Sequence, residues 1–127
     1  MKKEDVYKAV RAACKAMDDK FGKDIKILDI AEISPLADYF IIATGLNPAQ
    51  TDAMTDACEK AFAASGMPVI RSEGARTGWY LMDFGSVIVH IFNKEQRDFY
   101  NLERIWSDAK AEDMSFAAGS KKETKAV

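Results

Sequence analysis

The sequence predicts an α/β fold in which a single domain builds a mixed β-sheet with helices mainly on one face. Three observations predict it. Two long stretches place apolar residues at helical spacing, runs of β-branched and aromatic residues lie between and after them, and 127 residues suffice for one domain with its own core. We expect the elements in the order α-β-β-α-β-β-β-α.

The first third of the chain predicts one helix and two strands. Apolar spacing predicts an amphipathic helix over residues 4–21, with Phe21 on its apolar stripe and Gly22 as the residue that ends it. Alternating and β-branched residues predict strands over 25–30 and 38–45, separated by a turn.

The second helix carries its start and stop signals in the sequence. Asn47 followed by Pro48 is typical of an N-cap and a first helical position, and Gly66 is typical of a helix end. The expected buried stripe consists of Ala49, Ala53, Met54, Ala57, Cys58, Ala61 and Phe62.

The second half predicts a short strand, a hairpin and a last helix. The short strand is expected at 67–72, and the hairpin joins strands at 79–84 and 86–92. Helical spacing returns at 93–106. The apolar positions of this last helix are Phe99, Leu102 and Trp106.

The domain is expected to span residues 1–109. The remainder, 110–127, consists of small and charged residues without periodicity, so we predict a disordered tail.

A hairpin with Gly85 and Ser86 as its loop sorts the side chains onto two faces. One face is almost wholly apolar and is expected to be core: Tyr80, Met82, Phe84, Val87, Val89 and Ile91. The other mixes aromatic and polar groups: Trp79, Leu81, Asp83, Ile88, His90 and Phe92. Such a mixture is typical of binding hot spots, so the second face is a candidate docking surface.

Asp83 and His90, the chain's only histidine, allow two other interpretations. They would be diagonal neighbours about 7–8 Å apart at the backbone, so they could form a catalytic pair, or another element could cover them and they could satisfy each other. Catalysis has little support, because the chain carries no GxSxG elbow, phosphate-binding loop or zinc-ligand cluster. We expect no catalytic residue, no metal and no cofactor.

Composition and charge indicate a cytosolic protein with a basic protein partner. No apolar run approaches the roughly 20 residues of a membrane span, the start has no signal-peptide core, and Cys14 and Cys58 match no metal or redox spacing, so we expect buried thiols. Residues 1–26 hold eight Lys or Arg and five Asp or Glu, whereas residues 27–108 hold six and twelve. An acidic body disfavours broad nucleic-acid contact and suits a basic partner, although simple solubility would also explain it.

Three segments together resemble the signature blocks of the ribosomal silencing factor family, also called the RsfS or Iojap-like proteins. They are DYFIIATG at 38–45, GWYLMDFGSVIVHIF at 78–92 and RDFYNLERIWSDA at 97–109, in the family's order and spacing. The resemblance covers about residues 4–109. The chain departs from the family pattern at 46–50, where Leu-Asn-Pro-Ala-Gln replaces a polar and basic helix start.

The resemblance implies a regulator rather than an enzyme. Members bind the free large ribosomal subunit through large-subunit protein fourteen, block joining of the small subunit and lower translation when nutrients are scarce. We therefore expect a bacterial cytoplasmic protein, a monomer or weak homodimer, with little direct RNA contact and no membrane association.

The resemblance and the hairpin geometry together assign a set of partner-binding residues. Trp79, Asp83 and His90 follow from the family pattern, and Leu81 and Phe92 follow from the predicted register. From the last helix we expect Tyr100 and Glu103 to be exposed contacts, whereas Leu102 and Trp106 are expected to pack on the sheet.

A fold similar to that of nucleotidyltransferases, which the resemblance also implies, leaves one alternative function. The chain could be a small or degenerate metal-dependent nucleotidyltransferase. Those enzymes need an Asp-x-Asp pair on a strand to hold metal, and the comparable strand here reads Asp38, Tyr39, Phe40. The enzyme interpretation is therefore the weaker of the two.

Overall fold

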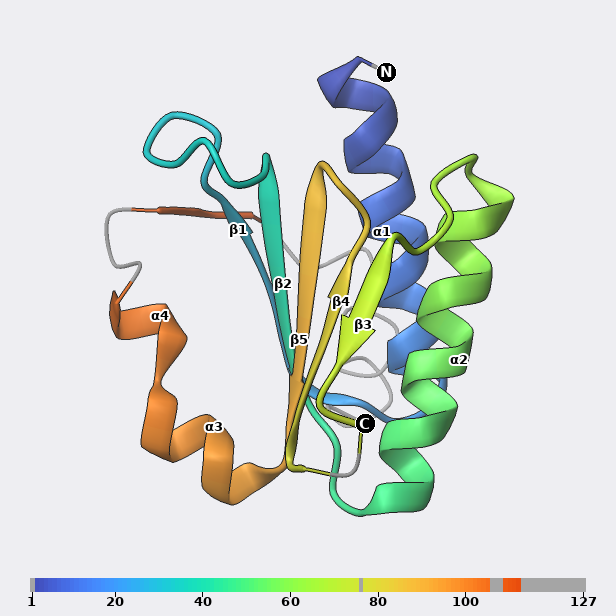
Figure 1. Cartoon of the computed structure of the whole chain (residues 1–127), viewed down its shortest axis with the longest axis vertical. Coiled ribbons are helices and arrows are strands. Elements are labelled where there is room, and N and C mark those ends of the chain that lie inside the picture. The colour runs from blue at the N-terminus through green and yellow to red at the C-terminus, as the bar shows by residue number, and fades with distance from the viewer. Residues whose placement is uncertain (1, 76, 106–108, 113–127) are drawn as a thin grey trace, which may run out of the picture.

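The structure is a computed structural model that describes residues 2–75, 77–105 and 109–112 (Figure 1). A six-stranded sheet in the order β3-β4-β5-β2-β1-β6 forms its centre. The elements are α1 (Lys3–Asp19), β1 (Lys23–Asp29), β2 (Tyr39–Thr44), α2 (Pro48–Ala64), β3 (Arg71–Glu73), β4 (Trp79–Asp83), β5 (Val87–Phe92), α3 (Lys94–Tyr100), α4 (Leu102–Ile105) and β6 (Lys110–Ala111). The predicted α/β class is confirmed.

The sheet is mixed, as predicted. β2 and β5 run parallel, and the other neighbouring strands pair antiparallel. The parallel pair lies at the middle of the sheet and is joined through α2 and the β3-β4 hairpin, because parallel neighbours need a crossover connection. β2 is buried along its whole length, which fits a run of six β-branched, aromatic and small residues.

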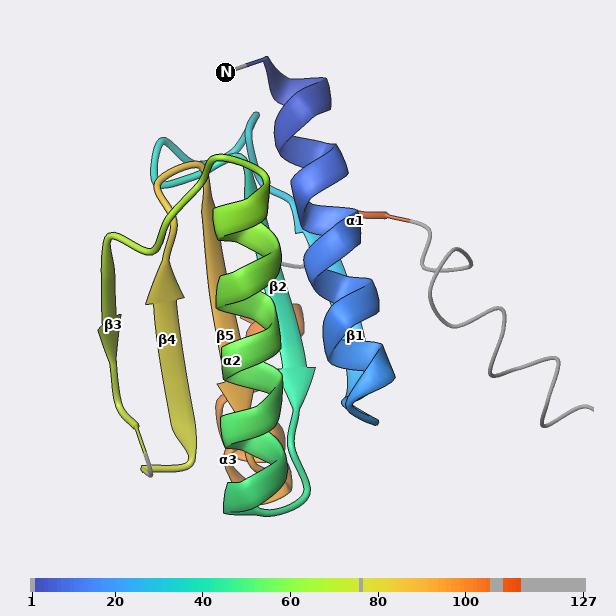
Figure 2. The same cartoon turned by 90° about the vertical axis from the view of Figure 1, so that its right-hand side faces the viewer.

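Helices and apolar side chains cover both faces of the sheet. α1 and α2 pack side by side on one face (Figure 2) and enclose the larger apolar cluster, which includes Met17, Ile41, Phe62 and Val89. α3 and α4 lie on the opposite face (Figure 1), above a smaller cluster of Leu28, Ile30, Ala37, Phe40, Ile42, Phe92 and Leu102. The long helices therefore occupy one face, as predicted, while the second face is covered only in part. Among the described residues, none of the helices combines the length and apolarity needed to cross a bilayer.

The end of α1 differs from the prediction. The chain turns at Phe21, which is left-handed with φ +64°, and not at Gly22. This turn directs Phe21 outward, where it is 66% exposed, so its predicted place on the buried stripe is wrong. Glycine at position 22 serves close packing, since a Cβ there would lie 2.7 Å from Cε of Met54.

α2 begins and ends where the sequence indicates. Oδ1 of Asn47 accepts a hydrogen bond from the backbone N–H of Gln50 at 2.8 Å, Pro48 occupies the first helical position, and Gly66 follows with φ +81°. The predicted stripe is confirmed in its large residues: Met54, Cys58 and Phe62 are buried, together with Thr55. Ala49 is exposed.

The hairpin register is the predicted one. Trp79 pairs with Phe92, Leu81 with His90 and Asp83 with Ile88. The loop closes with a hydrogen bond from the N–H of Phe84 to the carbonyl of Val87 at 2.9 Å, and Gly85 takes φ +90° within it. The preceding strand begins at Arg71 instead of the predicted 67, because Met67 is buried in the core directly after α2.

The predicted last helix is divided in two. Asn101 is left-handed with φ +46° and ends α3, and α4 follows in a new direction. Phe99, one of the apolar positions of the predicted helix, is 77% exposed, whereas Leu102 is buried as expected. Trp106 lies outside the described residues.

The predicted boundary at residue 109 also needs correction. Lys110 and Ala111 pair with Asp29 and Leu28 as the short edge strand β6, so they belong to the sheet and not to a tail. The rest of the predicted tail, from residue 113, lies outside the described residues.

Candidate functional site: an aromatic surface around Trp79

Trp79 lies on β4 on the less covered face of the sheet and is the centre of an aromatic group. Its ring centroid is 4.5 Å from that of Tyr100 and 5.1 Å from that of Phe92. Its indole Nε1–H donates a hydrogen bond to Nδ1 of His90 at 3.1 Å. Since a half-buried indole N–H needs a partner, this bond fixes the orientation of the ring.

His90 lies beneath this group and not at the surface. It is 5% exposed and packs against Phe40, with ring centroids 4.9 Å apart and edge to face. Burial lowers the pKa of His90 from 6.5 to about 4, so the ring is neutral near pH 7. With Nδ1 accepting from Trp79, the ring proton sits on Nε2, which is buried and has no hydrogen-bond partner within the described part of the chain.

Asp83 and His90 do not act on each other. Oδ1 of Asp83 accepts the backbone N–H of Gly85 at 2.8 Å and so braces the hairpin turn, while Oδ2 lies 3.9 Å from the guanidinium of Arg71. The structure therefore contains neither the acid–imidazole pair of a catalytic site nor the mutually satisfied pair of a covered core.

A buried arginine places Tyr100 against Trp79. Arg97 of α3 points into the protein, where Nη1 donates to Oγ1 of Thr44 and Nη2 donates to the carbonyl of Asp24, both at 2.8 Å. The same helix is capped by Asn93, whose Oδ1 accepts the N–H of Gln96 at 2.7 Å. Arg97 could not be identified from the sequence, because its partners lie 53 and 73 residues away along the chain and no local pattern marks them.

We define the aromatic surface as Trp79, Phe99 and Tyr100. Phe99 is 77% exposed and Tyr100 is 37% exposed, and their rings meet edge to face at 5.1 Å. The phenolic ring of Tyr100 lies between Phe99 and Trp79, so three aromatic side chains form one continuous contact surface. Phe99 was not among the predicted contacts, since helical spacing marked it only as an apolar position of the last helix.

The structure corrects the predicted contact set at two residues. Phe92 has no exposed surface and His90 almost none, so they support Trp79 from below instead of touching a partner. Leu81 and Asp83 are half-buried on the same face of β4 as Trp79. The side chain of Glu103 lies outside the described part of the structure.

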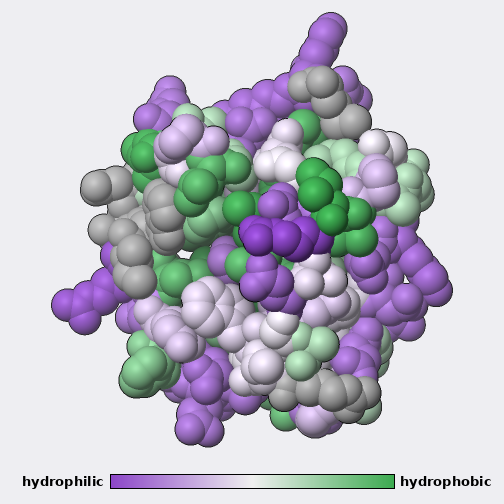
Figure 3. Space-filling view, viewed as in Figure 1, coloured by the Kyte–Doolittle hydropathy of each residue, from purple (hydrophilic) through white to green (hydrophobic). Residues whose placement is uncertain are grey.

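The surroundings of the aromatic surface are mixed in polarity. α3 exposes Lys94, Glu95 and Asp98 next to Phe99 and Tyr100, since Arg97 is turned inward. In the view of Figure 1, hydrophobic and hydrophilic residues are interspersed over the visible surface (Figure 3). Apolar anchors set among polar groups are typical of protein–protein interfaces.

The described residues include few groups that could support catalysis. No group of three His, Cys, Asp or Glu side chains among them could hold a metal ion. Cys14 and Cys58 are buried, and burial raises the pKa of both thiols well above its ordinary value, so both stay protonated. Phe40, at the second position where a nucleotidyltransferase strand would carry aspartate, is buried in the smaller apolar cluster.

Comparison with known proteins finds similarity over nearly the whole chain. The family profile described as "Ribosomal silencing factor during starvation" matches residues 3–127. A protein named ribosomal silencing factor RsfS from Bacillus subtilis is 38% identical over 117 residues, which cover 91% of this chain and 97% of the relative. The protein of the same name from Chromobacterium violaceum is 33% identical and covers 97% of this chain and 99% of the relative.

Two solved structures have a similar fold. A crystal structure of a protein from Chromobacterium violaceum has a TM-score of 0.77 at 30% identity and covers 84% of this chain and 88% of that chain. One from Bacillus halodurans has a TM-score of 0.72 at 31% identity, with coverage of 84% and 98%.

Proposed function

This chain belongs to the ribosomal silencing factor family, and from that premise we propose that it binds the free large ribosomal subunit through large-subunit protein fourteen. Family membership gives it a regulatory role in ribosome silencing. The finer proposal is steric: with the partner covered, the small subunit cannot join, and translation falls under nutrient limitation.

The observation that carries the proposal is the aromatic surface. Trp79, Phe99 and Tyr100 leave apolar area exposed on a rigid base, because His90 and Phe92 hold the indole and Arg97 holds α3. Aromatic anchors of this kind dominate the energy of protein interfaces, where truncation of one can cost about 2 kcal/mol or more. We therefore propose Trp79 as the central contact, flanked by Tyr100, Leu81, Asp83 and Glu103.

The charge distribution supports a basic protein as partner. Residues 27–108, which include the aromatic surface, hold twelve Asp or Glu and six Lys or Arg, and Arg97 is among the six but is buried. An acidic surface attracts a basic protein and repels phosphate. We accordingly propose contact with ribosomal protein and little contact with RNA, by a monomer or weak homodimer in the bacterial cytoplasm.

Co-sedimentation with separated ribosomal subunits tests the partner and the surface together. We expect the wild-type protein to pellet with the large subunit and not with the small one, and Trp79→Ala to remain in the supernatant. Phe21→Ala is the matched control, because Phe21 is also aromatic, is 66% exposed and follows the end of α1, away from the aromatic surface. Equal pelleting of all three proteins would show that Trp79 is not part of the binding site. No pelleting with either subunit would refute the proposal.

A further inference from the structure

The loop between β1 and β2 exposes two large apolar side chains. Leu36 is 61% exposed and Ile33 is 45% exposed. The loop projects on the same side of the sheet as α3 and α4 but at the other end of the strands, on the left of Figure 1. Ile30 and Ala37, which begin and end this segment, are buried in the smaller apolar cluster together with Leu102. The exposed pair therefore lies on the same side of the sheet as the aromatic surface.

Hydrogen bonds hold the backbone of this loop. The N–H of Ile30 donates to the carbonyl of Asp38 at 2.9 Å and closes the loop. Within it, the N–H of Ser34 donates to the carbonyl of Ile30 at 2.9 Å, and Oγ of the buried Ser34 accepts the N–H of Leu36 at 3.1 Å. Leu36 is thus presented to solvent on an ordered backbone, which lowers the entropy cost of binding a partner.

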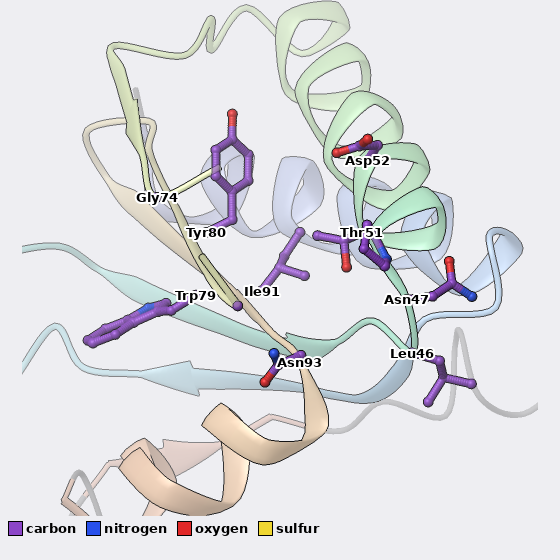
Figure 4. Close-up of a pocket in the computed structure, with 11 residues that line it drawn as sticks. Leu46, Asn47, Thr51, Asp52, Gly74, Trp79, Tyr80, Ile91 and Asn93 are labelled. Atoms are coloured by element: carbon purple, nitrogen blue, oxygen red, sulfur yellow. The ribbon is translucent and has the colours of Figure 1, made fainter. Parts of the chain in front are cut away.

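Half-buried side chains of β4 and β5 connect the loop to Trp79. Trp79 points away from α2, whereas Tyr80 lies on the α2 side (Figure 4), so every second residue of β4 shares the face of Trp79. Leu81 is half-buried on this face, and so is Ile88, which packs against the cluster that contains Ala37. Because five residues of an antiparallel strand span about 14 Å, the loop and the aromatic surface lie about one strand length apart on one face.

The aromatic surface alone is smaller than a stable protein interface requires. A specific interface buries about 800 Å² on each partner. A fully covered aromatic side chain contributes about 150–250 Å², and the three in this surface are already partly buried, Tyr100 to the point of being only 37% exposed. The rest of the area has to come from neighbouring residues on the same face, and the exposed pair on the loop is placed to supply part of it.

The charge of the loop matches a basic partner. Residues 27–59 contain no lysine or arginine, whereas the loop carries Glu32 next to Ile33 and ends at Asp38. Glu32 is exposed. A carboxylate beside two apolar side chains attracts a basic protein and repels the phosphates of RNA. This is the preference proposed for the aromatic surface, so one partner can cover both.

We propose that Glu32, Ile33 and Leu36, which we call the loop contact, extend the docking surface and bind the same basic ribosomal protein as Trp79. The inference rests on the proposed function, since it names further contacts for that partner. Binding covers the apolar pair, and Glu32 pairs with a lysine or arginine of the partner.

The affinities of wild type, Leu36→Ala and Phe21→Ala for purified large-subunit protein fourteen test the loop contact. Phe21 is the control, because it is 66% exposed, close to the 61% of Leu36, and follows α1, which packs on the opposite face of the sheet. We expect Leu36→Ala to bind about three- to tenfold more weakly, because it buries fewer apolar carbons. Phe21→Ala should bind like the wild type.

Phe99→Ala, measured alongside, separates the loop contact from the proposed function. A loss in Phe99→Ala with wild-type affinity in Leu36→Ala would overturn the loop contact and leave the partner and the aromatic surface in place. Equal losses in Leu36→Ala and Phe21→Ala would overturn it as well. No binding by the wild type would refute the partner and the loop contact together.

The charge of Glu32 has its own test. We expect Glu32→Lys to slow association with the partner, and the effect to decrease as salt concentration rises, because charges at the rim of an interface act mainly on the association rate. Association as fast as that of the wild type at low salt would contradict the pairing of Glu32. Self-association of the free protein that is lost in Leu36→Ala, with unchanged affinity for the ribosomal protein, would assign the loop to a second copy of this chain and overturn the proposal.

Discussion

At the scale of single residues, the contact between Trp79 and His90 explains why one histidine stands in an apolar hairpin. A buried aromatic residue in its place would leave the indole N–H without an acceptor, and an unsatisfied buried donor costs about 1–3 kcal/mol. The neutral imidazole supplies that acceptor while packing as an aromatic ring against Phe40. His90 therefore serves the aromatic surface by holding its central residue.

The depressed pKa of His90 makes a prediction about stability against pH. In the unfolded chain the ring titrates near 6.5, whereas in the folded protein its pKa is about 4. Above pH 6.5 both states are neutral and the protein has its full stability. As the pH falls from 6.5 to 4 the unfolded state takes up the proton first, so about 3 kcal/mol of stability is lost in this window.

Urea denaturation at pH 7.0, 5.5 and 4.5 measures this loss, with His90→Asn as the control that cannot titrate. We expect the wild type to lose more stability than His90→Asn across the window. Parallel pH curves for the two proteins would show that His90 is protonated as readily in the folded state as in the unfolded state.

At the scale of elements, α3 depends on contacts that are remote in sequence. Arg97 is buried and joins α3 to the ends of β1 and β2 through Asp24 and Thr44. Replacing it by alanine leaves these groups without their donor and loosens the helix that carries Tyr100. We expect Arg97→Ala to lower the free energy of unfolding by about 2–4 kcal/mol, because hydrogen bonds from a buried charged group are among the strong ones.

Lys94→Ala is the matched control for Arg97→Ala, since Lys94 is exposed on the same helix. Surface substitutions of this kind change stability by less than about 0.5 kcal/mol. Denaturant titration measures the free energy of unfolding of both variants. An equal decrease in Arg97→Ala and Lys94→Ala would contradict the role of Arg97.

The break between α3 and α4 makes a second prediction at this scale. Asn101 has φ +46°, a conformation that glycine and asparagine tolerate and that costs other residues about 1–2 kcal/mol. We expect Asn101→Ala to be destabilised by about 1 kcal/mol and Asn101→Gly to be close to the wild type. Thermal unfolding of the two variants tests this, and equal midpoints would argue against the left-handed turn.

The sequence predicted the elements whose signals are local and missed those that depend on distant partners. Asn47 with Pro48, Gly66 and the alternation around Gly85 mark helix ends and register within a few residues, and these predictions are confirmed. The division of the last helix depends on one left-handed residue, Asn101, within a helical pattern, and the pairing of Lys110 with Asp29 joins residues that are far apart in the sequence. Helical spacing alone marked Phe99 as an apolar position and did not reveal that it is 77% exposed.

At the scale of the whole molecule, the residues that stabilise the fold are different from those that form the aromatic surface. The larger apolar cluster under α1 and α2 stabilises the sheet, and the smaller cluster beneath α3 and α4 stiffens the base of the aromatic surface. Of the aromatic surface, Trp79 was proposed from the hairpin and Tyr100 from the last helix. Burial of His90 and Phe92 could not, because the number of layers over the second face depends on the path of the chain after β5.

Two exposed phenylalanines at different places in the fold allow the central claim to be tested without disturbing the core. Phe99 is 77% exposed within the aromatic surface, and Phe21 is 66% exposed at the end of α1. The first measurement we would make is the affinity of wild type, Phe99→Ala and Phe21→Ala for purified large-subunit protein fourteen. We expect Phe99→Ala to bind at least about tenfold more weakly than the wild type and Phe21→Ala to bind like the wild type. Equal affinities of the two variants, or a loss confined to Phe21→Ala, would contradict the assignment of the docking surface.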